Sequence, residues 1–186
     1  MCPHLFFAKY KFSIFHDGNV VVLENPNKLI LKYMNNRVNI VLPKHRFRNN
    51  IVDEFEFLKK QYFFNRKQIK IIEKLLRYKT NFLSENRFII RKHNSNQVIN
   101  LMNLWWRYYQ KGIFRDQLSF PVICKIKNVK PYLIDNFLNH HLMYYVTPHS
   151  KTNLKYKLKY FFVSNIINKI LFYFFKIKHF LTKMFF

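Results

Sequence analysis

Short runs of β-branched and aromatic residues recur in the first half of the chain and predict β-strands. Two of these runs lie within residues 10–23, on either side of the turn signal Asp17-Gly18, and predict two short strands around a turn. A third run covers residues 38–42, where Pro43 stops it, and a fourth covers residues 88–91. The sequence therefore predicts several short strands before residue 92.

Hydrophobic residues at helical spacing alternate with these runs and predict helices. A helical stretch begins over residues 53–58, with acidic residues in its first turn, and the pattern continues over residues 66–78. Another helix, capped by Asn94 or Ser95, should run to about Gln110. We interpret its apolar stripe as core, with Trp106 extending the same face: Val98, Leu101, Met102, Trp105 and Tyr109. Because strand and helix patterns alternate, the sequence favours an α/β fold.

The composition changes near Lys151, beyond which the chain has no Asp or Glu. We therefore expect a domain over residues 1–153 and a basic aromatic tail over residues 154–186. Lysines seven residues apart in the tail predict an amphipathic helix that lies on an anionic membrane surface. The longest uncharged run of the tail, residues 160–168, is far shorter than the roughly 20 apolar residues that a membrane span requires. A terminal helix packed on the domain would show the same pattern.

Positive charge is in large excess, with 33 Lys and Arg against 9 Asp and Glu and a formal net charge of +24. Such a balance predicts attraction to nucleic acid, a lipid surface or a phosphorylated substrate. Codons rich in A and T would also produce this abundance of Lys, Asn, Ile, Phe and Tyr. Two cysteines, Cys2 and Cys124, are too few for a disulfide framework and favour a reducing compartment. With no secretory-signal layout at the start, we expect a cytoplasmic protein, peripheral on the inner face of the membrane.

The only two glycines, Gly18 and Gly112, each lie beside a candidate site. Asp17-Gly18-Asn19 is either a hairpin turn or an acid motif whose oxygens hold a divalent cation. Arg115-Asp116-Gln117 offers a carboxylate for acid–base chemistry and an amide to orient a sugar, or else it is a solvated helix start. A weaker pair is His149 and Lys151, which could complete a metal site and neutralise a diphosphate.

Several segments, taken in order, resemble one protein family. They are residues 3–19, residues 44–54, residues 83–94 and the Trp-Trp helix that leads into Arg115-Asp116-Gln117-Leu118-Ser119-Phe120, which is the most specific part. Over roughly residues 3–151 the chain is similar to a glycosyltransferase-like domain that was formerly catalogued as a domain of unknown function. That domain occurs in plant proteins and in bacterial surface-polysaccharide loci.

The resemblance implies a GT-A-like mixed sheet flanked by helices, followed here by the C-terminal amphipathic helix. It also implies a divalent metal, Mn²⁺ or Mg²⁺, held by Asp17, Asn19 and His149. Asp116 and Gln117 are then expected to be the catalytic residues beside the sugar. The residues expected to bind substrate are His45, Arg48, Glu85, Arg115 and Lys151.

The function that the resemblance implies is transfer of a sugar from a nucleotide-sugar donor to an acceptor in surface polysaccharide or glycan assembly. The family begins well before the acid motif, whereas Met1 falls just ahead of it here, so we expect the N-terminal part to be missing. An alternative is a non-catalytic basic module that binds nucleic acid or an anionic membrane surface, although no RRM, KH or helix-turn-helix signature is visible. An inactive relative that only holds partners at a membrane is a third reading.

Overall fold

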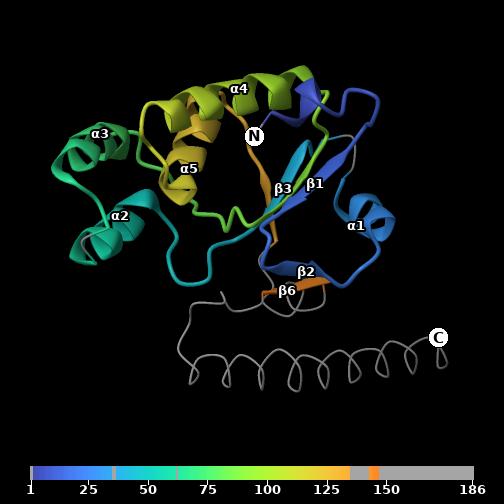
Figure 1. Cartoon of the computed structure of the whole chain (residues 1–186), viewed down its shortest axis with the longest axis horizontal. Helices are drawn as coiled ribbons and strands as arrows, with labels where there is room; N and C mark the ends of the chain where they lie inside the picture. The colour runs from blue at the N-terminus through green and yellow to red at the C-terminus, as the bar shows by residue number, and fades with distance from the viewer. Residues whose placement is uncertain (1, 35–36, 62, 135–142, 147–186) are drawn as a thin grey trace. The chain divides into compact units, whose positions relative to one another are not determined.

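A computed structural model describes residues 2–34, 37–61, 63–134 and 143–146 of the chain (Figure 1). The chain divides into two units, one formed by Met1–His16 and Pro26–Asp135 and the other by Asp17–Asn25 and Asn136–Phe186. Each unit has a sheet of its own. The tail over residues 154–186, with its expected amphipathic helix, lies outside the described residues.

The first unit contains a mixed four-stranded sheet with the strand order β1-β4-β3-β5. Its strands are β1 (Ser13–His16), β3 (Ile40–Pro43), β4 (Phe88–Arg91) and β5 (Tyr132–Ile134). β4 pairs antiparallel with both β1 and β3, whereas β3 pairs parallel with β5. Every residue of β3 and β4 is buried, as is typical of central strands that are covered on both faces.

In the described part of the chain, five α-helices and one 3₁₀ helix accompany this sheet: η1 (Pro3–Leu5), α1 (Pro26–Tyr33), α2 (Ile51–Lys60), α3 (Arg66–Leu76), α4 (Asn96–Gln110) and α5 (Asp116–Ile126). Side chains at three helix starts accept a backbone N–H bond, namely those of Asn50, Asn65 and Ser95. The expected helices are thus confirmed, although α2 begins two residues earlier than its pattern and α3 ends two residues sooner. The α/β class with a mixed sheet is also confirmed and is consistent with a GT-A-like fold.

The main core lies between the sheet and the α4–α5 pair, which runs along one side of it in Figure 1. Trp105 is only 3 % exposed and its ring lies 4.9 Å, centroid to centroid, from that of Phe120. The indole Nε1 donates a hydrogen bond to Ser119 Oγ at 3.0 Å. Trp106, in contrast, is 39 % exposed, so the prediction that it extends the buried face is wrong. Successive helical residues point about 100° apart, and only one of the pair can face the sheet.

The second unit contains the antiparallel pair β2 (Val20–Val22) and β6 (Tyr144–Val146). β1 and β2 are the two strands expected within residues 10–23, but they do not pair with each other. The hairpin-turn interpretation of Asp17-Gly18 is therefore wrong. β1 instead pairs along its full length with β4, whose buried apolar residues give it more to pack against than a three-residue neighbour does.

Some elements had no clear sequence signal. α1, β5 and β6 were not predicted, and β3 includes Pro43, which was expected to lie just beyond the strand. Residues 117–124 of α5 are all buried. The alternative that Arg115-Asp116-Gln117 is only a solvated helix start is therefore wrong. None of the helices within the described ranges is long and apolar enough to cross a membrane.

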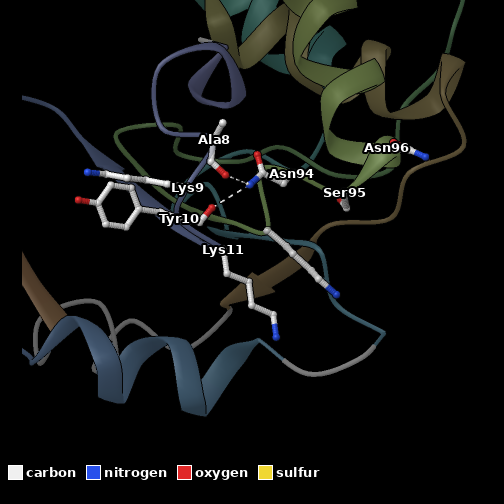
Figure 2. Close-up of a pocket in the computed structure, with 8 residues that line it drawn as sticks. Ala8, Lys9, Tyr10, Lys11, Asn94, Ser95 and Asn96 are labelled. Atoms are coloured by element: carbon white, nitrogen blue, oxygen red, sulfur yellow. Dashed lines mark hydrogen bonds between the residues drawn. The ribbon is translucent and has the colours of Figure 1, made fainter.

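The N-terminal segment is tied to the start of α4 by Asn94 (Figure 2). Its Nδ2 donates to the carbonyl oxygens of Ala8 at 2.7 Å and Tyr10 at 2.9 Å. A basic pocket of about 570 Å³ lies here, lined in part by Lys9, Lys11 and Lys92. These two hydrogen bonds to backbone carbonyls give Asn94 a structural role.

Candidate functional site

The candidate site follows the carboxyl end of β3. β3 and β5 run parallel, and the chain beyond such strand ends is where open α/β sheets bind ligands. The backbone of this loop is fixed by bonds from Lys44 N to Ile134 O at 3.0 Å and from His45 N to Leu83 O at 2.9 Å. The next residues, Arg46 to Arg48, therefore start from a rigid anchor.

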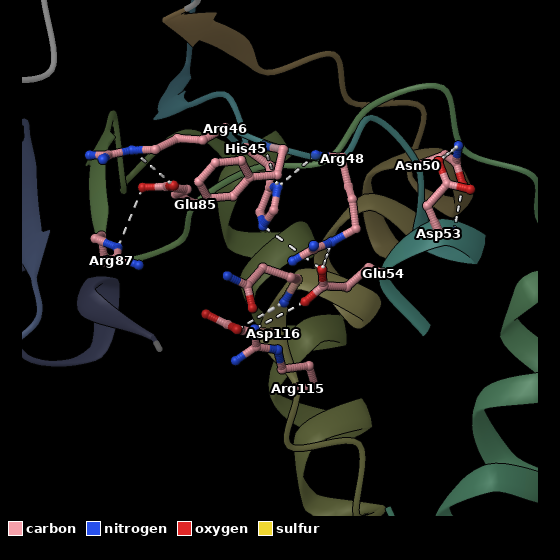
Figure 3. Close-up of polar contacts among 12 residues, drawn as sticks. His45, Arg46, Arg48, Asn50, Asp53, Glu54, Glu85, Arg87, Arg115 and Asp116 are labelled. Carbon is pink, nitrogen blue, oxygen red and sulfur yellow. Dashed lines mark hydrogen bonds and ion pairs between the residues drawn. The ribbon is translucent and has the colours of Figure 1, made fainter. Parts of the chain in front are cut away.

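Glu54 is the centre of the site (Figure 3). It lies in the first turn of α2, which Asn50 fixes by accepting the backbone N–H of Asp53, and its side chain is fully buried. Oε2 accepts a hydrogen bond from Arg48 Nε, and Oε1 accepts one from Arg115 Nη2 at 3.0 Å. His45 Nε2 lies 3.8 Å from Oε2. We call these four residues, His45, Arg48, Glu54 and Arg115, the Glu54 cluster.

A second carboxylate is held in a similar way. Glu85 is 4 % exposed, and its two oxygens form ion pairs of 3.4 Å with Arg46 Nε and Arg87 Nε. We call Arg46, Glu85 and Arg87 the Glu85 cluster. Across the two clusters four guanidinium groups face two carboxylates, which leaves a charge of 4 − 2 = +2. The arrangement can therefore attract an anionic ligand.

His45 is held in its neutral form. Its Nδ1 accepts hydrogen bonds from the backbone N–H groups of Phe47 at 3.3 Å and Arg48 at 3.1 Å, so the ring proton belongs on Nε2, which faces Glu54. Burial lowers the pKa of His45, the carboxylates of Glu54 and Glu85 raise it, and Arg48 and Arg115 lower it, with a net shift downward.

This shift predicts a loss of stability in acid. Below the ordinary histidine pKa of 6.5 the unfolded chain binds a proton at His45, whereas the folded protein does not. The free energy of unfolding is therefore highest above pH 6.5 and decreases as the pH falls from there toward the lowered pKa. His45→Asn supplies an oxygen in place of Nδ1 and cannot titrate. Thermal unfolding between pH 7.5 and pH 5 should show a smaller loss in His45→Asn than in the wild type. Equal losses in both proteins would contradict this prediction.

Asp116 and Gln117 begin α5 and follow Arg115 of the Glu54 cluster, and Figure 3 shows Asp116 beside Arg115 and Glu54. Asp116 Oδ1 accepts the backbone N–H of Gln117 at 2.9 Å. The Gln117 side chain is buried, and its Oε1 has no hydrogen-bond partner among the residues that the structure describes. Because Arg115 bonds Glu54, the two expected catalytic residues that follow it in the chain lie beside the Glu54 cluster.

The structure describes two of the three expected metal ligands. Asp17 and Asn19 belong to the second unit, where Asp17 is exposed and Asn19 is partly buried. His149 and Lys151 lie outside the described residues. Within the described ranges, no three His, Cys, Asp or Glu side chains come together as a metal-binding group.

The comparison with known families decides the relationship. The family model described as "TOD1/MUCI70, glycosyltransferase-like domain" matches residues 1–149. The chain belongs to this family. A search of curated proteins and a search of solved structures each gave no significant match.

The sequence of this TOD1/MUCI70 domain does not single out Glu54 as a site residue, because the helix dipole alone explains a carboxylate in the first turn of α2. A signal was present: Glu54 lies three residues after Ile51 and four before Leu58, on the buried stripe of α2. A carboxylate on such a stripe must have cationic partners, since burying an unpaired charge is costly. The partners Arg48 and Arg115 are 6 and 61 residues away in sequence, and only the fold brings the second one near.

Proposed function

We propose that this TOD1/MUCI70 domain transfers a sugar from a nucleotide-sugar donor to a glycan acceptor. The proposed transferase class rests on the family match. The observation that carries the placement is the start of α5, where Asp116 and Gln117 adjoin a cationic site beyond the carboxyl end of β3. A basic site suits the phosphates of the donor, and a neighbouring carboxylate suits the acceptor hydroxyl.

The proposed roles follow from chemistry. Asp116 accepts the proton of the acceptor hydroxyl, and Gln117, whose buried Oε1 has no hydrogen-bond partner among the described residues, hydrogen-bonds a sugar hydroxyl. Substrate contacts are assigned to His45, Arg48, Glu85 and Arg115 in the first unit, together with Lys151.

A divalent metal, Mn²⁺ or Mg²⁺, is part of the proposal. Asp17 and Asn19 supply one carboxylate and one amide oxygen two residues apart, which fits ions that usually keep several waters and substrate phosphates as ligands. His149 would be a third protein ligand. When bound, the metal would supply charge neutralisation for the leaving diphosphate.

The biological setting is also proposed from chemistry. Surface polysaccharide assembly takes place at membranes, and the basic aromatic segment over residues 154–186 suits contact with anionic lipid on the cytoplasmic side. This contact would hold the enzyme beside a membrane-borne acceptor.

Turnover of a panel of nucleotide-sugar donors with Mn²⁺ tests the proposal. Asp116→Ala should reduce turnover by about 100-fold or more, since a positioned acid or base contributes about that factor, and Asp17→Ala should also reduce it. Glu73→Ala is the matched control, because it removes an exposed carboxylate from α3. Unchanged turnover in both aspartate variants would contradict the site assignment. No turnover by the wild type with any donor would contradict the transferase.

A further inference from the structure

Two arginines from distant parts of the chain share one buried carboxylate. Arg48 follows β3 and Arg115 precedes α5, yet both donate to Glu54, one to each oxygen. Glu54 is fully buried, whereas the side chains of Arg48 and Arg115 are 19 % and 29 % exposed. The carboxylate therefore fixes the two guanidinium groups from the inside, and both remain accessible from outside.

Aromatic rings also orient these guanidinium groups. The central carbon of Arg48 lies 4.1 Å from the ring centroid of Phe57, and that of Arg115 lies 5.6 Å from the centroid of Phe63. Contact with a ring covers the flat face of a guanidinium and leaves its N–H edge for hydrogen bonds. Both side chains are thus ordered before any ligand arrives, which lowers the entropic cost of binding.

The balance of charge and hydrogen bonds at this pair is incomplete. Within the four residues of the Glu54 cluster two guanidinium groups face one carboxylate, 2 − 1 = +1, and the neutral His45 adds no charge. The carboxylate of Asp116 adjoins the cluster at the start of α5. Arg115 Nε is buried and has no acceptor within the described part of the chain. If the cluster served only to join α2 to α5, leaving this donor without an acceptor would cost free energy with no compensating gain.

The Glu85 cluster repeats the arrangement. Arg46 and Arg87 flank a buried glutamate. Figure 3 shows this cluster on one side of His45 and the other three members of the Glu54 cluster on the opposite side. Arg46 of one cluster lies between His45 and Arg48 of the other in the chain, so the two clusters are neighbours. Two neighbouring cationic groups suit a ligand with two linked phosphates better than a ligand with a single carboxylate.

We propose that Arg48 and Arg115, positioned by Glu54, bind the diphosphate of the donor directly, through a contact that requires no metal ion. The identity of the ligand as a donor diphosphate rests on the proposed function. Arg48 and Arg115 are the binding groups, and Glu54 acts only through them, as a positioning residue.

Calorimetric titration of the full chain with inorganic pyrophosphate in EDTA tests this proposal. The wild type should show saturable binding. Arg48→Ala and Arg115→Ala should each weaken it by about tenfold or more, because each removes charge-assisted hydrogen bonds. Arg66→Ala, which removes an exposed positive charge at the start of α3, should leave the affinity unchanged. Thermal melts identify any variant that does not fold, and Arg48→Lys then replaces Arg48→Ala, since it keeps the charge opposite Glu54.

The positioning role has its own readout. Glu54→Gln keeps the shape of the side chain but weakens its hold on both arginines, so it should lower pyrophosphate affinity while the Arg66→Ala control stays at the wild-type value. The proposal is overturned if pyrophosphate binds only when Mn²⁺ is present. It is also overturned if Arg48→Lys and Arg115→Ala bind as well as Arg66→Ala.

The outcome is separable from that of the proposed function. Pyrophosphate binding that depends on Arg48 and Arg115, in a protein that turns over no sugar nucleotide, would support the anion site and contradict the transferase. Sugar-nucleotide turnover that does not change when either arginine is replaced would support the transferase and contradict the anion site.

Discussion

Replacing Glu54 by alanine should lower the free energy of unfolding by about 3–5 kcal/mol, which is the usual cost of removing one partner from a buried ion pair. The substitution leaves Arg48 and Arg115 close together without the carboxylate that both bind, and it also opens a cavity under α2. Urea unfolding measures the change.

Glu56→Ala is the matched control for this experiment. Glu56 lies on the same helix but is exposed, so its removal should change the free energy of unfolding by about 0.5 kcal/mol or less. If Glu54→Ala were no more costly than Glu56→Ala, Glu54 would not be the centre of the site.

Replacing Trp105 by alanine should cost about 3–5 kcal/mol in the free energy of unfolding, because it empties the space between α4, α5 and the sheet. The change also leaves Ser119 Oγ without its indole donor. Urea unfolding, followed by circular dichroism so that the loss of a fluorophore does not matter, measures the effect.

The neighbouring tryptophan provides the control. Trp106 is 39 % exposed and stacks on Tyr109 with centroids 5.6 Å apart, so Trp106→Ala should cost about 1 kcal/mol. Equal costs for the two variants would mean that the apolar stripe of α4 is assigned to the wrong face.

Elements with strong local signals could be predicted from the sequence. α3 begins at a reciprocal capping box between Asn65 and Gln68, and α4 begins at the cap Ser95. These signals depend on residues three or four apart. β4 was predicted with its observed bounds because four consecutive positions suit a buried strand.

Strand pairing and the short elements could not be predicted in this way. The partner strands of β1 and β2 are far away in sequence. β4 lies about 70 residues after β1, and β6 lies more than 120 residues after β2. β5 and β6 have three residues each, too few for an alternating pattern to be distinctive.

The candidate site, too, could be predicted only in part from the sequence. His45, Arg48 and Arg115 were selected through family resemblance, and the structure brings them around one carboxylate, but their roles remain predictions. The sequence does not select Glu54, because the helix dipole already explains a glutamate in the first turn of a helix. Only the burial of Glu54 shows that it also pairs with the arginines.

The order of the strands has a consequence for folding kinetics. Every pairing in the four-stranded sheet joins residues far apart in sequence: Val41 lies 90 − 41 = 49 positions from Ile90 and 132 − 41 = 91 positions from Tyr132. Such long loops must close before any pairing returns free energy, which makes folding slow. During synthesis, Glu54 emerges 61 residues ahead of Arg115, so its hydrogen bond with Arg115 cannot form until the start of α5 has been made. The site is thus one of the last features of the domain to form.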